Sequence, residues 1–423
     1  MDNILVTGGA GFIGRQLIKH LLETTDAKIY NIDKLGYASD ADYLYKLPDA
    51  RKRYRLFCID LLDDRYLQEI ITGLQPAKIF HLAAESHVDN SIRSPKDFIF
   101  SNIVGTFNLL EACRLYMKEP YKFLHVSTDE VFGSLHPDTT DTFFVESTPY
   151  NPSSPYSASK AASDHLVMAW HNTYDFPALI TNCSNNYGPG QYPEKLIPMT
   201  ITNALAGKPI TVHGEGKNIR DWLHVSDHVK ALSMLMDQGD VGQQYCIGGF
   251  GERTNIEVVT TICQLLDQLK PIEGSYLDLI EHVTDRPGND LRYAIDPRKI
   301  HGLGWRAEYT FEQGIKETIE SYLTKWRLLQ LLVLGIPHLQ TMEKLEEYME
   351  SVSQKQQFLD NHDMLLQSLL LSKQNAGNQP FNQEPQGIGN ESFESSQGIS
   401  EPGGGETAWS IGFCCPHWAP RRN

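Results

Sequence analysis

The sequence has no excess of positive charge and no cysteines paired at the short spacing that a zinc site or redox motif needs. Its 37 Lys and Arg residues stand against 53 Asp and Glu residues, which gives a formal net charge of −16. An acidic chain repels phosphate backbones and anionic lipid surfaces, so neither nucleic acid nor a membrane is an expected partner. The seven cysteines are scattered, and Cys414, Cys415 and His417 form an incomplete ligand set. We therefore expect reduced thiols, a cytoplasmic protein and no metal site.

Long apolar runs and an export signal are missing as well. The longest apolar stretch, residues 328–336, is interrupted by Gln330 and Gly335. It is far shorter than the roughly 20 residues of a membrane-spanning helix. The start of the sequence lacks the basic and apolar regions of a secretory signal. With 41% hydrophobic and 21% charged residues, the chain of 423 residues has the composition of a globular protein with a full core.

Short β-rich segments alternate with amphipathic, helix-length segments over residues 1–186. Several of the β-rich segments are apolar throughout, as expected for strands that helices cover on both faces. This alternation predicts an α/β fold, a Rossmann-type domain with a doubly wound parallel sheet. The predicted strands comprise residues 4–7, 28–32, 55–58, 78–82, 122–127 and 178–183.

The alternation weakens after residue 186, where glycine and proline become frequent. Residues 187–326 are predicted to form a smaller C-terminal lobe that binds substrate in a cleft against the sheet. Residues 327–370 are predicted as a helical extension, because apolar residues between 342 and 352 recur at helical spacing. Residues 371–423 are predicted as a low-complexity, disordered tail, since 24 of the 36 residues from 371 to 406 are Gly, Pro, Ser, Gln or Asn.

A glycine-rich turn follows the first predicted strand. Gly8, Gly11 and Gly14 have the spacing that lets a diphosphate approach the N-terminus of the next helix closely. Asp33 ends the second strand, 33 − 14 = 19 residues after Gly14. A carboxylate there can accept hydrogen bonds from both ribose hydroxyls and would repel a 2′-phosphate. The order of strand, turn, helix and acid favours a binding site for NAD over a purely structural turn, and NAD over NADP.

Tyr156 and Lys160 are four residues apart and therefore lie on one face of a helix. A nearby ammonium lowers the pKa of a phenol from its usual value of about 10, and the same lysine can hold the cofactor ribose. The phenolate can then accept a proton from a sugar hydroxyl as hydride leaves. Tyr-x-x-x-Lys is often only structural, but its position after a Rossmann half favours a catalytic role.

Thr128, Asp129 and Glu130 follow directly after the strand of residues 122–127. The carboxyl ends of strands in a doubly wound sheet face the ligand crevice, so these side chains are expected beside a substrate. Neighbouring acid and base groups suit an elimination, in which one removes a carbon-bound proton and the other protonates the leaving hydroxyl. The alternative is a solvated Asp-Glu turn.

Seven further segments make this interpretation more specific. Together they resemble the NAD-dependent epimerase/dehydratase family, the extended short-chain dehydrogenases/reductases that act on nucleotide sugars, and within it most closely the dTDP-glucose 4,6-dehydratases. The resemblance extends from residue 1 to about residue 326. The segments are DKLGYA (33–38), LAAESHVD (82–89), TDEVFG (128–133), SNNYGP (184–189), EKLIP (194–198), RDW (220–222) and DRPG (285–288).

The resemblance implies a hydro-lyase that uses NAD to convert dTDP-glucose to dTDP-4-dehydro-6-deoxy-glucose, a precursor for deoxysugar and rhamnose biosynthesis. Tyr156, supported by Lys160, would take the proton of the C4 hydroxyl as C4 is oxidised, and Thr128 would hydrogen-bond the sugar. Glu130 would remove the C5 proton, Asp129 would protonate the leaving C6 hydroxyl, and hydride would return to C6. The resemblance also implies a homodimer that pairs helices near residues 108–116 and 156–170.

The binding residues follow from the same resemblance. The implied NAD contacts are Gly8, Gly11, Phe12, Ile13, Gly14, Asp33, Lys34, Asp60, Leu61, Ala83, Ser101, Tyr156, Lys160 and Asn186. The implied substrate contacts are Ser86, Thr128, Asn185, Lys195, Leu196, Arg220, Asn255 and Arg286. The two arginines also make chemical sense alone, because a guanidinium fork suits a diphosphate.

The chain departs from the family pattern near the expected nucleotide base. It has Thr211-Val212-His213-Gly214 there, and Asn289 replaces a histidine that is common in relatives. A UDP-glucose 4,6-dehydratase, a UDP-sugar 4-epimerase and a non-catalytic NAD-binding protein therefore stay open as alternatives. Asp129 and Glu130 argue against the epimerase, and a binding module would not need all of Asp129, Glu130, Tyr156 and Lys160.

Overall fold

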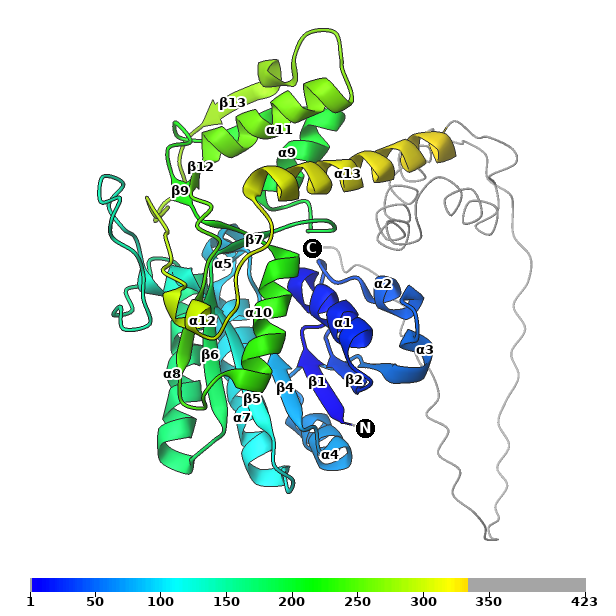
Figure 1. The fold of residues 1–423 in the computed structure, drawn as a ribbon, viewed down its shortest axis with the longest axis vertical. Coiled ribbons are helices and arrows are strands. Elements are labelled where there is room, and N and C mark those ends of the chain that lie inside the picture. The colour runs from blue at the N-terminus through cyan, green and yellow to red at the C-terminus, as the bar shows by residue number, and fades with distance from the viewer. Residues whose placement is uncertain (1, 334–423) are drawn as a thin grey trace, which may run out of the picture. The chain divides into compact units, whose positions relative to one another are not determined.

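A seven-stranded parallel sheet is the main element of the computed structural model, which describes residues 2–333 (Figure 1). Its strand order is β11-β6-β5-β4-β1-β2-β3, and all neighbours are parallel. This order confirms the predicted doubly wound sheet, and each predicted strand is found within one residue at either end. The strands are β1 (Asn3–Thr7), β2 (Lys28–Ile32), β3 (Tyr54–Phe57), β4 (Lys78–His81), β5 (Lys122–Thr128), β6 (Ala178–Cys183) and β11 (Gln244–Ile247).

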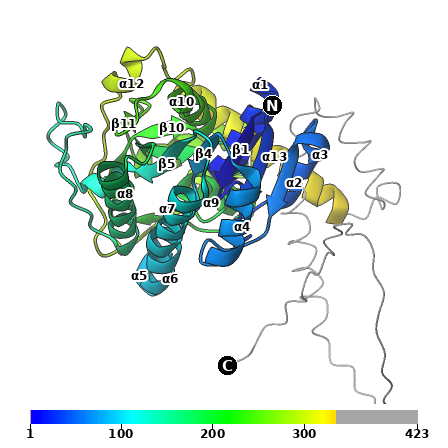
Figure 2. The same cartoon turned by 90° about the horizontal axis from the view of Figure 1, so that it is seen from below.

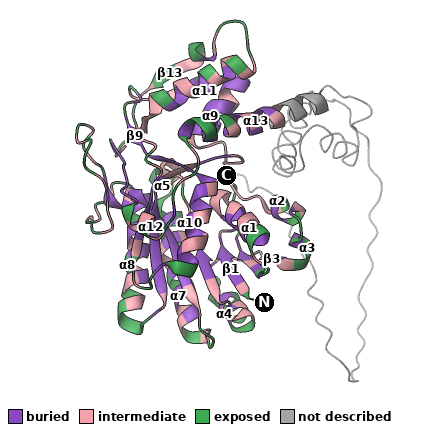
Figure 3. Ribbon diagram, in the orientation of Figure 1, coloured by how far each residue is buried: buried purple, intermediate pink, exposed green. Residues whose placement is uncertain are grey.

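Helices cover both faces of this sheet (Figure 2). On one face lie α1 (Phe12–Thr24) and α10 (Val225–Gln238), and on the other lie α4 (Asp64–Leu74), α7 (Gly105–Tyr116) and α8 (Pro155–Tyr174). The strands are buried on both sides, as Figure 3 shows. Shorter helices in the connections are α2 (Ala41–Lys46), α3 (Ala50–Arg53), α5 (Val88–Arg93), α6 (Pro95–Phe98) and α12 (Arg298–Gly302), with single helical turns at Ile99–Val104, Asp129–Phe132 and Tyr276–Leu279.

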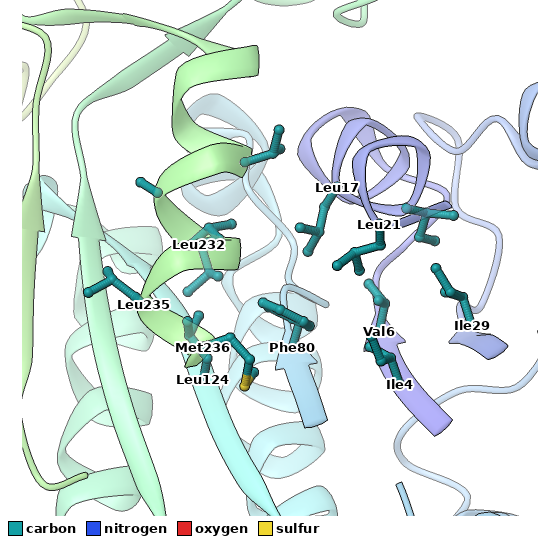
Figure 4. Packing of buried hydrophobic residues seen from close by; sticks show 14 of the residues in the cluster. Ile4, Val6, Leu17, Leu21, Ile29, Phe80, Leu124, Leu232, Leu235 and Met236 are labelled. Atoms are coloured by element: carbon teal, nitrogen blue, oxygen red, sulfur yellow. The ribbon is translucent and has the colours of Figure 1, made fainter. Parts of the chain in front are cut away.

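The sequence of β1 shows why both faces need cover. Side chains alternate between the faces of a strand, so Ile4 and Val6 join the core under α1 and α10, whereas Leu5 joins the core under α4, α7 and α8. In Figure 4, Leu17 and Leu21 of α1 lie above the sheet, next to Ile4 and Val6. All five side chains are at most 2% exposed, so the continuously apolar strand is stabilised from both sides.

A second group of elements forms its own core. It contains α9 (Leu196–Leu205), α11 (Asn255–Leu269) and α13 (Phe311–Val333), whose apolar faces bury Ile201, Ile262 and Ile315. Three short strand pairs accompany these helices: β8 (Ile210–His213) with β13 (Ile280–Val283), β7 (Asn185–Tyr187) with β10 (Trp222–His224), and β9 (Ile219–Arg220) with β12 (Arg253–Thr254).

The chain crosses between the two groups more than once. After β10 it returns to the sheet with α10 and β11, and then enters the second group again at β12. The division into residues 1–186 and 187–326 stays a prediction. Of the predicted extension, residues 327–333 are the end of α13, and the remainder, the predicted tail and the Cys414-Cys415-His417 set lie outside the described residues.

Within residues 2–333, no helix has the length and apolar character needed to cross a bilayer. The same residues contain no group of three or more His, Cys, Asp or Glu side chains that could hold a metal ion.

Candidate active site

The glycine-rich turn lies at the carboxyl end of β1 and leads into α1. Gly8 has a left-handed backbone with φ of +70°, and a Cβ on it would lie 2.6 Å from the backbone nitrogen of Ala83. A Cβ on Gly14 would collide with the Gly8 carbonyl oxygen. No side chain caps the first turn of α1, which begins after Gly11. The uncapped N–H groups and the close backbone approach fit the diphosphate of a dinucleotide such as NAD.

Asp33 lies next to this turn at the end of β2. Its Oδ2 accepts a hydrogen bond from the Ala10 backbone N–H (2.9 Å), and its Oδ1 accepts one from the Leu35 N–H (2.8 Å). These bonds fix a buried carboxylate at the wall of the cavity described below. There it can accept hydrogen bonds from ribose hydroxyls, and its charge would repel a 2′-phosphate, so the site fits NAD better than NADP.

One cavity of about 330 Å³ connects the glycine turn with the end of β5. Its walls include all of the predicted NAD contacts: Gly8, Gly11, Phe12, Ile13, Gly14, Asp33, Lys34, Asp60, Leu61, Ala83, Ser101, Tyr156, Lys160 and Asn186. They also include the predicted catalytic residues Thr128, Asp129 and Glu130, together with Ser86, Asn185 and Lys195. Leu196, Arg220, Asn255 and Arg286 are not among its lining residues.

Asp129 and Glu130 form an acid pair at the end of β5, in which Asp129 is buried and Glu130 is half-buried. Thr128 caps the helical turn that carries them, because its hydroxyl accepts a hydrogen bond from the Glu130 N–H (3.3 Å). Asp129 is 1% exposed, and its Oδ2 has no hydrogen-bond partner among the described atoms. Burial raises the pKa of Asp129 well above its ordinary value, and the charges of Glu130 and Asp221 raise it further.

The environment of Glu130 differs in one respect. Burial also raises its pKa, but the positive charges of Lys195, Arg220 and Arg286 oppose this rise. Asp129 is therefore better suited to be the proton donor and Glu130 to be the proton acceptor. Two adjacent carboxyl groups whose pKa values are separated in this way can act as general acid and general base.

Tyr156 and Lys160 project from the first two turns of α8. The start of this helix is fixed by Pro155 in the first turn and by a capping box, in which Ser154 and Ser157 exchange hydrogen bonds of 3.0 Å. Both functional side chains are buried and line the cavity. The pair thus faces the acid pair across the same space.

The pKa of Tyr156 is not shifted in the expected direction. Burial raises it well above its ordinary value, the negative charge of Glu130 raises it further, and a hydrogen bond with Thr128 opposes the rise. The Lys160 ammonium donates instead to the carbonyl oxygen of Val126 (2.9 Å). The lowered pKa expected from Tyr156 and Lys160 alone is therefore wrong, because burial is the largest influence on the phenol.

Three cations surround Glu130. Lys195 donates to the Ser86 carbonyl oxygen (2.8 Å), and Arg286 lies 3.4 Å from a carboxylate oxygen of Asp89. Arg220 donates to the Asp290 carbonyl oxygen (2.8 Å) and lies 4.2 Å from the centre of the Tyr293 ring. Two guanidinium groups and an ammonium whose charges act on Glu130 suit the diphosphate of a nucleotide sugar.

The structure also places the two remaining predicted substrate contacts and two residues that depart from the family pattern. Leu196 and Asn255 are the first residues of α9 and α11. In β8, Nδ1 of His213 lies 3.3 Å from the Thr284 carbonyl oxygen. Asn289 accepts a hydrogen bond from Arg220 (3.1 Å), so this departure from the family pattern contacts one of the three cations.

Several polar residues in or beside the cavity were not predicted. Tyr37 and Glu194 line the cavity and share a hydrogen bond of 2.8 Å from the phenol to the carboxylate. Both lie in segments that carry the family resemblance, which is the signal that could have identified them. His125 lies 3.4 Å from the Lys160 ammonium and 3.1 Å from Asp164. The position of Asp164 four residues after Lys160 is the sequence signal that could have identified it.

The arrangement can support two kinds of proton transfer in one cavity. The Tyr156 phenol is placed to exchange a proton with a hydroxyl while a dinucleotide exchanges hydride with the same carbon. The acid pair is placed to remove one proton and supply another. A redox step and an elimination can therefore take place on one bound molecule.

Comparison with known proteins gives consistent results. Residues 5–318 match the family model described as GDP-mannose 4,6 dehydratase. A dTDP-glucose 4,6-dehydratase from Neisseria gonorrhoeae is 52% identical over 333 residues, which cover 76% of this chain and 95% of the relative. The match extends over nearly the full length of the relative.

Solved structures show the same similarity. A dTDP-glucose 4,6-dehydratase from Bacillus anthracis in complex with NAD has 42% identity and a TM-score of 0.68, and the match covers 77% of this chain and 97% of that one. The enzyme DesIV from Streptomyces venezuelae, also a dTDP-glucose 4,6-dehydratase and solved with NAD and dTDP bound, has 39% identity and a TM-score of 0.70, with 76% and 97% covered.

Proposed function

We propose that this chain, which belongs to the dTDP-glucose 4,6-dehydratase family of extended short-chain dehydrogenases/reductases, converts dTDP-glucose to dTDP-4-dehydro-6-deoxy-glucose with the loss of water. The observation that supports this function most directly is the pair of Asp129 and Glu130 in the same cavity as Tyr156, Lys160 and the glycine turn. An epimerase needs the redox pair but has no use for a second acid and base.

The first step is oxidation at C4 of the glucose ring. Bound NAD would supply the hydride acceptor for C4 and the later hydride donor for C6, and Glu130 would return the proton to C5 in the second transfer. Tyr156 accepts the proton of the C4 hydroxyl, Lys160 stabilises the resulting charge, and Thr128 orients the sugar by a hydrogen bond. The glycine turn and Asp33 hold the cofactor.

The second step is elimination across C5 and C6. The C4 ketone makes the C5 proton acidic, and Glu130 removes it. Asp129, which holds its proton in the buried site, protonates the C6 hydroxyl as it leaves as water. Lys195, Arg220 and Arg286 provide the positive charge that the nucleotide diphosphate requires.

We also propose that the protein is a cytoplasmic homodimer. Phe107 and Leu115 of α7 and Tyr174 of α8 are 42%, 55% and 49% exposed, which is unusual for large apolar side chains on adjacent helices. Ala158 and Ala169 are also exposed on α8 and would allow close helix packing across a two-fold axis. Cys113, Cys183, Cys246 and Cys263 are buried free thiols, which fits a reducing compartment. Sedimentation at micromolar concentration tests the dimer, since a monomeric mass would contradict it.

The decisive experiment is incubation of the purified protein and NAD with dTDP-glucose, and in parallel with UDP-glucose. We expect the alkali-sensitive absorbance of a 4-keto sugar with dTDP-glucose and no net accumulation of reduced cofactor. Tyr156→Phe serves as the inactive control. A C4 epimer without loss of water would identify an epimerase, preference for UDP-glucose would overturn the assigned base, and NAD binding without turnover would identify a binding module.

A further inference from the structure

Asp164 continues the catalytic face of α8. Tyr156, Lys160 and Asp164 are each four residues apart and therefore lie one above the other on the helix. Lys160 is 4% exposed and Asp164 is 1% exposed. The Lys160 ammonium bonds a backbone carbonyl, which cannot neutralise its charge, and lies 3.4 Å from Nε2 of His125. The same ring nitrogen lies 3.1 Å from Oδ1 of Asp164.

Hydrogen-bond donors converge on one oxygen of the Asp164 carboxylate. Its Oδ2 accepts hydrogen bonds from the hydroxyls of Ser127 (2.8 Å) and Tyr150 (2.8 Å). The side-chain amide of Asn182 lies within 3.4 Å of the same oxygen. Three donors that converge on one oxygen favour an anion, which accepts several hydrogen bonds and donates none.

The other titratable groups around Lys160 are uncharged at neutral pH. Burial lowers the pKa of His125 on β5 to about 4 and also lowers the pKa of His81 on β4, whose ring centre is 5.1 Å from that of His125. Burial raises the pKa of Cys183 on β6, so its thiol keeps its proton. Among the described residues of α8, β4, β5 and β6, Asp164 is thus the negative charge that faces Lys160.

We propose that Asp164 is the buried counter-charge that keeps Lys160 protonated, with His125 as the spacer between them. An ammonium removed from water without an opposite charge releases its proton readily, and a neutral amine would no longer stabilise the Tyr156 phenolate. Asp164 is therefore a positioning residue for the redox pair. This inference rests on the proposed function only in giving Lys160 its role at C4.

Asp164→Asn tests the charge while it preserves the size of the side chain. In the NAD-loaded protein, NMR of isotope-labelled lysine side chains can follow Lys160, whose signal is assigned by its loss in Lys160→Met. We expect wild-type Lys160 to stay protonated through neutral pH. In Asp164→Asn, its titration should move to lower pH by about one to three units, and the alkaline limit of turnover should move with it.

Tyr150→Phe is the matched control, because it removes a hydrogen bond to the same carboxylate oxygen and leaves the charge. Its Lys160 titration should coincide with that of the wild type. An equal shift in both variants would mean that Asp164 acts only through local structure, and an unshifted Lys160 in Asp164→Asn would also overturn the proposal. If Asp164→Asn does not fold, the wild-type titration is still a test: a Lys160 side chain that is already neutral at neutral pH would refute the proposal. Because the titration needs no substrate, failure of the proposed function appears separately, as inactivity toward dTDP-glucose with a normal Lys160 titration.

Discussion

The substitution Glu130→Gln separates the two chemical steps of the proposed reaction. Glutamine has nearly the same shape, and the backbone N–H of residue 130 can still donate to the Thr128 hydroxyl. It cannot accept the C5 proton. Tyr156 and Lys160 stay in place for oxidation at C4, so the reaction should stop after that oxidation, before water is lost.

The expected loss can be given a magnitude. A missing general base typically costs a factor of roughly 10² to 10⁴, which corresponds to about 2.7–5.5 kcal/mol in the barrier of the elimination. Oxidation should respond differently, since the charge of Glu130 is one cause of the raised pKa of Tyr156. Its removal should lower that pKa, and the oxidation step should therefore extend to lower pH in the variant than in the wild type.

The assay combines three measurements on the NAD-loaded protein. On addition of dTDP-glucose, Glu130→Gln should show the absorbance of reduced nicotinamide, while product formation and exchange of the C5 proton with solvent both fall. Asp129→Asn should also lose product formation but keep exchange of the C5 proton, because Glu130, the base for that proton, is intact. Glu308→Gln, at an exposed carboxylate that pairs with Lys230, should behave as the wild type. Full turnover in Glu130→Gln would refute the assignment of the elimination pair.

Four further outcomes are expected. Tyr156→Phe should give neither reduced cofactor nor product in the same assay, because the C4 proton has no acceptor. Arg292→Ala should lower the free energy of unfolding in urea by roughly 3 kcal/mol. The Arg292 guanidinium is 1% exposed and pairs with Glu252 at 2.8 Å, and its removal would leave a partly buried carboxylate without a partner. Burial lowers the pKa of His228 from 6.5 to about 3. As pH falls below 6.5 the unfolded chain therefore binds a proton that the folded protein does not, and the free energy of unfolding decreases. Between about pH 7 and about pH 5, the free energy of unfolding of His228→Gln should decrease by about 2 kcal/mol less than that of the wild type. Truncation after Lys355 should leave turnover within a few-fold, because every assigned site residue precedes that position, and a larger loss in a folded, truncated protein would show that the removed segment contributes to the site.

The sequence was most informative where local pattern decides structure. Six strands could be predicted because continuous apolar runs between turn residues need no knowledge of their neighbours. The seventh, Gln244–Ile247, was missed because four residues next to glycines form a strand only by pairing with β6. Among the site residues, Gly8, Gly14 and Asp33 were predictable since backbone geometry and spacing demand them.

Properties that depend on burial were harder to predict. The pKa of Tyr156 follows from desolvation, which a sequence does not reveal, and so its direction was wrong. His125 and Asp164 become partners only when α8 packs on β5, which brings together residues 39 positions apart (164 − 125 = 39). The spacing of Asp164 from Lys160 was visible, but a carboxylate at that spacing gains meaning only once both side chains are known to be buried.

The strand order explains how one cavity can hold both reactions. In the sheet, β5 lies two positions from β1, with β4 between them. Neighbouring strands are about 4.8 Å apart, so the glycine turn after β1 and the acid pair after β5 are separated by about 10 Å. An extended dinucleotide whose diphosphate is bound at β1 can therefore place its reactive ring at β5. The acid and the base of the elimination are then tuned by different parts of the chain. Burial at the end of β5 raises the pKa of both groups. Three cations carried by the segments after β7 oppose this rise at Glu130, whereas at Asp129 only one of them, Arg220, does so. Residues from those segments therefore take part in setting the strength of the base.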